Sequence, residues 1–391
     1  MTEKKLLSFR ARVVKDINEQ LVLKLIQEHG IISSSDLVNI TGMRPSTIFN
    51  ILKGLSAKAI VNFHGKGIST DKGGKKPYLW TLNKESAYVI GLDIEIGEIT
   101  AVILDFSGGI IAKKIIKLQK FSTLDELASI IIKVTSQIVD ENNIDTEKVL
   151  GLGVAFAGVV DYSNGIVIMS SLLPEMNFPL LDKLSSLPFP VLVENNANAA
   201  AIGLKWNGYV KNKRNFITVL TEIDKGVGGL GIGIIIEGEL YRGASFSAGE
   251  LHPHLPTLQQ MLVTIRTKLS EGKILKEYVS DIDAIDMDIL IAAAKSGDEI
   301  ATMVFSKIGD IVGQTIAPAI ALLNPEALII TGILSEMEDV IIDSIRKAIE
   351  LRVLSVTCSN LNLLADKHHQ YAVAVGAASL LLEDSFSIPL K

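Results

Sequence analysis

Cysteine is nearly absent from this chain of 391 residues, which contains only Cys358. One cysteine cannot form an internal disulfide and cannot supply a cysteine-rich zinc site. Long apolar runs are missing too, because the longest, residues 316–334, is broken by two prolines, an asparagine and a glutamate. The sequence shows neither a membrane-spanning helix nor the apolar segment of a secretory signal after Met1. We therefore expect a cytoplasmic protein that has no membrane partner.

Basic residues are outnumbered overall, since 38 Lys and Arg face 44 Asp and Glu and the net charge is −6. They are concentrated at the start of the chain. Residues 1–83 hold 13 Lys and Arg against 6 Asp and Glu, whereas residues 84–391 hold 25 against 38. A basic segment before an acidic body is typical of a domain that meets phosphates joined to one that does not. A basic surface that is merely solvated would give the same counts.

Residues 18–55 show the pattern of three short helices. Apolar residues recur at helical spacing from Leu21 to Ile26, and residues 33–36 offer N-caps to a second helix. Gly42 permits a tight turn through a positive φ, and Pro45 suits the first turn of a third helix. Two helices joined by a short glycine turn form the helix-turn-helix pattern.

A wing is predicted directly after these helices. Two strand-like segments, Ile60–Phe63 and Tyr78–Leu82, flank a glycine-rich basic stretch over residues 64–77. A loop of this composition between two strands is typical of a wing. We therefore predict a winged helix-turn-helix domain over residues 1–83 that binds operator DNA.

The third helix carries polar side chains opposite its apolar stripe. Arginine suits guanine and asparagine suits adenine in the major groove, and wing lysines suit phosphates or the adjacent minor groove. An ordinary solvated helix face is the alternative interpretation. The predicted DNA-binding residues are Arg44, Ser46, Thr47, Asn50 and Lys53 on the helix, with Lys72, Lys75 and Lys76 in the wing.

From Tyr88 onward the sequence predicts an α/β body. A three-strand meander over residues 89–118 is followed by a helix, two further strands and a second helix over residues 196–205. A second meander begins at Phe216, and two copies of one order of elements indicate a duplicated fold. We predict a first lobe over residues 84–210 and a second over residues 211–391, whose C-terminal helix packs back on the first.

Several motifs resemble those of the ROK family, which comprises repressors and sugar kinases of the actin-like fold. In chain order, the matching segments are residues 73–77, 151–161, 194–201, 247–252, 324–330 and 376–378. The resemblance extends from about Asp16 to Glu383. It implies an α/β protein with an N-terminal winged helix-turn-helix followed by a duplicated actin-like (ribonuclease H-like), two-lobed sugar-kinase fold.

Two departures from the family pattern bear on catalysis. Family kinases carry an Asp, which takes the proton from the sugar hydroxyl, where this chain has Asn196, and a neutral amide cannot act as that base. Their phosphate loop reads Asp-x-Gly-Gly-Thr, whereas here Glu95 and Glu98 follow Asp93 and would repel phosphates. The resemblance thus implies a protein that is not an enzyme and needs no cofactor.

The resemblance also bears on the effector and metal sites. A sugar needs donors and acceptors close together, which amides and a carboxylate supply. Asn195 could instead only cap the helix that follows it. The family's zinc-binding cysteines are missing, so no metal is expected, and Lys276 stands where the family has a sugar-contacting Glu. The predicted sugar-binding residues are Asn195, Asn196, Glu250 and His252.

The leading hypothesis is a sequence-specific transcription regulator of carbohydrate metabolism that acts as a repressor. It binds operator DNA as a homodimer or higher homo-oligomer and responds to a sugar held between its lobes. Two alternatives stay open. One is a sugar kinase with residual ATP-dependent activity, and the other is a constitutive DNA-binding protein whose C-terminal domain only dimerises.

Overall fold

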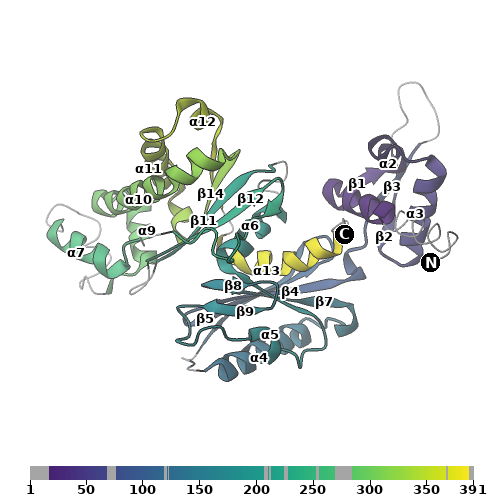
Figure 1. Cartoon of the computed structure of the whole chain (residues 1–391), viewed down its shortest axis with the longest axis horizontal. Coiled ribbons are helices and arrows are strands. Elements are labelled where there is room, and N and C mark those ends of the chain that lie inside the picture. The colour runs from purple at the N-terminus through teal and green to yellow at the C-terminus, as the bar shows by residue number, and fades with distance from the viewer. Residues whose placement is uncertain are drawn as a thin grey trace.

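The computed structural model describes residues 17–67, 76–118, 121, 123–206, 210, 213–223, 228–251, 255–268, 284–366 and 369–386. Figure 1 shows a small N-terminal part beside a larger body of two lobes, with α13 (His369–Phe386) running between the sheets of the two lobes. Across these ranges, no helix has both the length and the apolarity that a membrane span requires.

The N-terminal part is a winged helix-turn-helix, as predicted. A helix over residues 17–29 leads to β1 (Ile31–Ser33), α2 (Ser34–Thr41), α3 (Pro45–Ala57), β2 (Val61–Lys66) and β3 (Tyr78–Leu82). The hydroxyl of Ser33 accepts a hydrogen bond from the Asp36 amide at 3.0 Å and so caps α2, and Gly42 ends α2 with φ 67°. The three strands form an antiparallel sheet in the order β1-β3-β2. The short β1 was not predicted.

The first lobe is a five-stranded sheet in the order β10-β7-β4-β5-β6. Its strands are β4 (Tyr88–Glu95), β5 (Glu98–Asp105), β6 (Ile110–Lys117), β7 (Val149–Phe156) and β10 (Val191–Asn195). Strands β4, β5 and β6 are antiparallel neighbours, while β7 runs parallel to β4 and β10 runs parallel to β7. One face of the sheet packs on α4 (Leu124–Glu141), beside α5 (Leu180–Lys183) and the hairpin of β8 (Val159–Asp161) and β9 (Ile166–Met169).

The second lobe repeats this sheet. Its strands are β11 (Phe216–Ile223), β12 (Gly228–Ile236), β13 (Glu239–Leu240), β14 (Ala327–Gly332) and β15 (Asn362–Ala365), in the order β13-β12-β11-β14-β15. Its outer face packs on helices that include α7 (Leu258–Lys268), α9 (Met287–Lys295), α10 (Glu299–Leu323) and α11 (Glu338–Glu350), with α12 (Ser355–Asn360) following α11.

The two sheets have the same topology, which confirms the predicted duplication. In each lobe the first three strands form an antiparallel meander, and the last two add in parallel beside the first strand. This is the α/β architecture that the motif resemblance implied. The predicted boundaries after residues 83 and 210 stay a prediction.

The inner faces of the sheets are covered by two helices, each of which packs on the sheet of the lobe that it does not belong to in sequence. Helix α6 (Asn196–Trp206) follows the first-lobe strand β10, yet its apolar residues pack with Phe216 and Ile329 of the second-lobe sheet. Helix α13 follows the second lobe, yet it packs with Val89 and Val102 of the first-lobe sheet. Because α6 and α13 also pack against each other, they form the layer that joins the lobes.

This central layer is so close-packed that it requires glycine. A Cβ atom at Gly376 of α13 would lie 1.7 Å from the Ala199 carbonyl oxygen of α6. At Gly153 of β7, a Cβ would lie 1.9 Å from the Ala377 carbonyl oxygen. In both places the obstacle is backbone, which cannot rotate away as a side chain can. A side chain at either position would therefore force α6, α13 and the first-lobe sheet further apart.

Candidate functional site

The predicted sugar-side residues lie where the first-lobe sheet meets α6. Asn195 is the last residue of β10 and Asn196 is the first of α6, and both are buried. The Asn195 Oδ1 accepts a hydrogen bond from the Asn198 amide at 3.0 Å, so Asn195 does cap the helix. Its Nδ2 donates to the Gly158 carbonyl at 2.8 Å. Capping and ligand binding are thus not exclusive roles for this side chain, because its amide group faces two directions.

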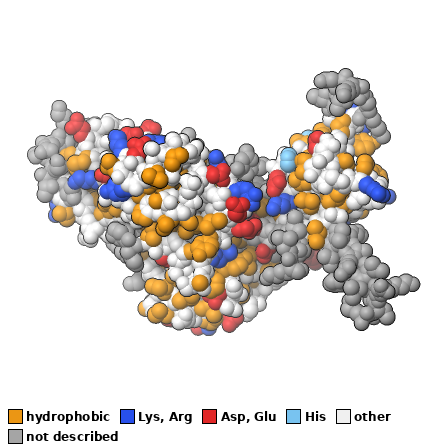
Figure 2. Space-filling view, turned by 45° about the horizontal axis from the view of Figure 1, so that its top comes forward, with side chains coloured by type: hydrophobic (Ala, Val, Ile, Leu, Met, Phe, Trp, Pro, Cys, Tyr) orange, Lys and Arg blue, Asp and Glu red, His pale blue; other side chains and the backbone are white. Residues whose placement is uncertain are grey.

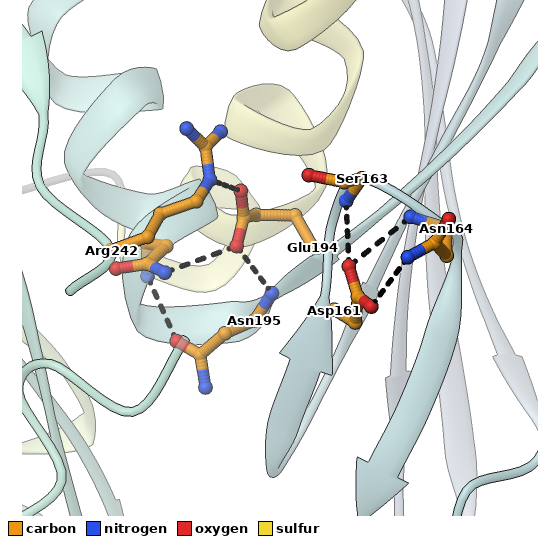
Figure 3. A network of polar contacts seen from close by, with 7 residues as sticks. Asp161, Ser163, Asn164, Glu194, Asn195 and Arg242 are labelled. Atoms are coloured by element: carbon orange, nitrogen blue, oxygen red, sulfur yellow. Dashed lines mark hydrogen bonds and ion pairs between the residues drawn. The ribbon is translucent and has the colours of Figure 1, made fainter. Parts of the chain in front are cut away.

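Three consecutive residues at the junction of β10 and α6 each contact a side chain of the second lobe. Glu194 pairs with Arg242, with 2.7 Å between Oε2 and Nε. Asn195 donates from Nδ2 to Glu250 at 3.5 Å, and Asn196 donates from Nδ2 to Glu222 at 2.5 Å. Figure 3 shows the first of these contacts, with the Arg242 side chain reaching the Glu194 carboxylate beside Asn195. Residues 194–196 therefore connect the two lobes at one point.

The Glu194–Arg242 pair is the most buried of these contacts. The Glu194 side chain is 1% exposed, and it also accepts hydrogen bonds from the Asn195 amide at 2.9 Å and from Asn198 Nδ2 at 3.0 Å. The Arg242 guanidinium lies 4.0 Å from the centre of the Tyr162 ring. A buried carboxylate needs a cation and further donors to offset its lost hydration, and Glu194 has both. Sequence reasoning missed Arg242 because its partner lies 48 positions away along the chain.

A cluster of carboxyl groups lies on the other side of Asn196. It consists of Asp93 and Glu95 at the end of β4, Glu98 at the start of β5, and Glu222 on β11. Burial, and then Glu95 and Glu222, raise the pKa of Asp93 well above its ordinary value. Burial and Glu98 raise the pKa of Glu95, and burial and Glu95 raise that of Glu222 to about 7. The groups disfavour one another's ionisation because they are like charges in a partly dry site.

This acidic cluster occupies the strand ends where the motif resemblance implied a phosphate loop. Glu95 and Glu98 were expected to repel phosphates, and Glu222 of the second lobe adds a carboxyl group that was not expected. The negative charges of a nucleotide's phosphates would be repelled by the carboxylates of this cluster. Asn196 donates to Glu222 and offers no carboxylate to accept a proton from a sugar hydroxyl. The arrangement suits hydrogen bonding to a neutral ligand and does not suit phosphoryl transfer.

The other predicted effector and metal residues are placed only in part. Glu250 is exposed and follows Gly249, whose φ is 94°, and it faces Asn195 as described. His252 lies outside the described residues, as does Lys276. In the described part of the chain, no group of three or more His, Cys, Asp or Glu side chains could hold a metal ion.

Of the predicted DNA-reading residues, Ser46, Thr47, Asn50 and Lys53 lie on α3, and Arg44 directly precedes it. The buried face of α3 consists of Ile48, Ile51, Leu52 and Leu55. Arg44, Ser46, Asn50 and Lys53 are exposed and Thr47 is partly exposed. In the wing, Lys76 is exposed, whereas Lys72 and Lys75 lie outside the described residues. The sequence interpretation omitted Phe49, which stands among these polar residues and is exposed.

A duplicated body of two equivalent sheets, joined by crossing helices and preceded by a winged helix-turn-helix, defines a regulator-like protein built on a sugar-kinase fold. The model of the ROK family matches residues 89–384, so the chain belongs to the ROK family. This confirms the family that the sequence motifs indicated.

Individual proteins are similar over the whole chain or over the body alone. The xylose repressor of Caldicellulosiruptor bescii is 26% identical, over 96% of this chain and 98% of its own length. A solved ROK family transcriptional regulator, described as a homologue of the E. coli MLC protein, has a TM-score of 0.76 at 22% identity and covers 96% of this chain and 97% of its own. A ROK glucokinase from Streptomyces griseus, solved with glucose and AMPPNP, has a TM-score of 0.66 at 24% identity and covers 75% of this chain and 99% of its own. The two structures share the fold with this chain.

Proposed function

We propose that this protein is a cytoplasmic transcription repressor of carbohydrate metabolism, which binds operator DNA through α3 and the wing and binds a sugar between its lobes. The observation that carries the proposal has two parts. An exposed polar helix, α3, precedes a kinase-like body, and in that body an acidic cluster occupies the place of the phosphate loop. The similarity to a xylose repressor along nearly the full length of both chains supports the proposal. The protein is a regulator and not an enzyme.

DNA binding is the part of the proposal that rests on α3. The N-terminal residues of a recognition helix contact base edges in the major groove, and Arg44, Ser46 and Asn50 are exposed at that end of α3. Asn and Arg side chains can each contact one base through two hydrogen bonds. Lys53 and Lys76 are exposed cations that suit the phosphate backbone, which supplies affinity without sequence preference.

Sugar binding rests on residues 194–196 and on Glu250. Their amides and carboxylate present donors and acceptors in a small space, which matches the hydroxyls of a sugar. Asn195 and Asn196 now use their Nδ2 groups to contact Glu250 and Glu222 of the second lobe. A sugar that takes over these donors replaces contacts between the lobes by contacts to itself. Binding therefore changes how the lobes are held together.

Regulation follows if the two lobe arrangements place the DNA-binding domains of a homodimer differently. A dimeric helix-turn-helix protein reads two half-sites at a fixed spacing along the DNA. A sugar that binds one arrangement more tightly shifts the protein toward it, by no more than its difference in affinity between the two. The sugar then releases or strengthens operator binding without touching the DNA.

The proposal is tested by operator binding with and without sugars. The operator is selected from random DNA with the full-length protein, and its affinity is measured by fluorescence anisotropy across pentoses, hexoses and amino sugars, with xylose first. We expect at least one sugar to change the affinity about tenfold or more, a typical size for allosteric coupling. Asn195→Ala and Glu250→Ala should lose the change in operator affinity that the sugar causes.

Each remaining outcome identifies an alternative. Operator binding that no sugar changes, together with no heat from any sugar in calorimetry, would leave the body as a dimerisation scaffold. Turnover of ATP with a hexose at about 1 s⁻¹, the low end for typical enzymes, would make the protein a kinase. Failure of the full chain to select any DNA sequence would refute the regulator function itself.

A further inference from the structure

One side chain on the exposed surface of α3 has a chemistry unlike that of its neighbours. Phe49 is 59% exposed, although four other apolar residues of the helix already form its buried stripe. Ser46 stands one turn before it, and Lys53 stands one turn after it. Residues three and four apart share a helix surface, so the Phe49 ring lies beside Ser46 and Lys53.

The helix does not need this ring for its own structure. Phe49 lies outside the buried stripe that faces the domain core, and Pro45 and Gly42 set the start of α3 and the turn before it. Within the described part of this domain, ring contacts join Phe63 to Tyr78 and Trp80 on β2 and β3 and do not include Phe49. In Figure 2, hydrophobic side chains stand among polar ones on the drawn face of this domain. An exposed phenyl ring at this position is therefore available to a partner.

The position of Phe49 on the helix indicates which partner. It is the fifth residue of α3, in the half of a recognition helix that enters the major groove. Thymine displays there a C5 methyl group, which side chains such as phenylalanine recognise by apolar contact. The neighbours of Phe49 are a hydroxyl and an ammonium group, which suit bases and phosphates beside it.

We propose that Phe49 determines operator specificity by packing against the C5 methyl group of a thymine, a role that rests on the proposed function of α3 in DNA binding. The polar residues Arg44 and Asn50 then read hydrogen-bonding edges, while Phe49 reads a methyl group. Substituting Phe49 removes preference for a thymine at one position in each half-site. It leaves the phosphate contacts, and hence the salt dependence of binding, unchanged.

The experiment is a double-substitution cycle, in which the methyl group is removed from the DNA and the phenyl ring from the protein, singly and together. Each thymine of the selected operator is replaced singly by deoxyuridine, which lacks only the C5 methyl, and the affinity of full-length protein is measured by anisotropy. We expect one thymine in each half-site at which this change weakens wild-type binding about fourfold, the value of one buried methylene-sized group. Phe49→Ala should bind both versions of the operator equally.

Two variants provide the controls. Phe49→Leu keeps an apolar side chain and should retain part of the discrimination. Ile31→Ala removes an exposed apolar side chain from β1, outside α3 and the wing, and should discriminate as the wild type does. Melting temperatures of all variants by circular dichroism show whether the domain is folded.

The outcomes separate this role from the proposed function. If Phe49→Ala still discriminates, or if wild type binds the operator and every deoxyuridine version equally, Phe49 does not read a methyl group. An exposed ring used for protein contacts would give that second result together with a change in oligomeric state on substitution. If wild type selects no DNA sequence, the regulator function is overturned and this role with it.

Discussion

Burial and a neighbouring carboxyl group disfavour the charged form of Glu222, and this should make the stability of the protein depend on pH. The pKa of Glu222 is raised from 4.5 to about 7 in the folded protein. Between these two pH values the folded protein holds a proton that the unfolded chain has released, so the free energy of unfolding falls as the pH rises. The folded protein therefore has its full stability from this group below pH 4.5, and the free energy of unfolding reaches its lower value above about pH 7.

Glu222→Gln should remove this loss and keep an oxygen that accepts from Asn196. We expect the variant to be more stable than wild type at pH 8, by at most about 3 kcal/mol, and to match it near pH 4. Urea denaturation at several pH values measures the difference. Glu147→Gln removes one negative charge from an exposed position and is the control. A constant difference between wild type and Glu222→Gln at all pH values would contradict the prediction.

At the scale of secondary-structure elements, the crossing of α6 and α13 should be the part of the body least tolerant of added volume. A methyl group at Gly376 meets the α6 backbone at Ala199, and overpacking of this kind costs about 1–3 kcal/mol or more. We expect Gly376→Ala to lower the free energy of unfolding by about 3 kcal/mol or to prevent folding of the body. Chemical denaturation followed by circular dichroism measures it.

Gly54→Ala is the matched control, because Gly54 is also helical and nothing lies within 4 Å of the added methyl group. Alanine in place of an unstrained glycine stabilises by about 0.4–1 kcal/mol. Equal stability of the two variants would show that the central layer can expand without cost.

The elements also show where sequence reasoning succeeds and where it fails. The bounds of β3 agree with the predicted segment Tyr78–Leu82, because an apolar run between polar turns is a local signal. The three-residue β1 and the β8–β9 hairpin are too short to give such a signal.

Contacts at the site have an even weaker local signal. The pairing of Glu194 with Arg242 and the approach of Glu222 to Asp93 depend on how two lobes close on each other. No spacing within either lobe encodes them. The motif resemblance located residues 194–196, but it could not show that all three reach across to the second lobe.

At the scale of the whole molecule, the proposed regulation predicts a reciprocal effect. If a sugar weakens operator binding by some factor, saturating operator must weaken sugar binding by the same factor. Isothermal titration of the sugar into free protein and into the protein–operator complex measures it. A sugar that releases DNA while its own affinity is unchanged by DNA acts by another route, such as aggregation of the protein.

The exchange of helices between the lobes also constrains how the chain is made. Domains generally fold in order as a chain leaves the ribosome, and the winged domain is complete after the first fifth of the sequence. The first-lobe sheet must wait for α13, which is translated after both sheets and covers its inner face. A nascent chain therefore carries the part that binds DNA well before the part that responds to a signal. A protein truncated before residue 369 would keep the winged domain but leave the apolar inner face of the first-lobe sheet exposed.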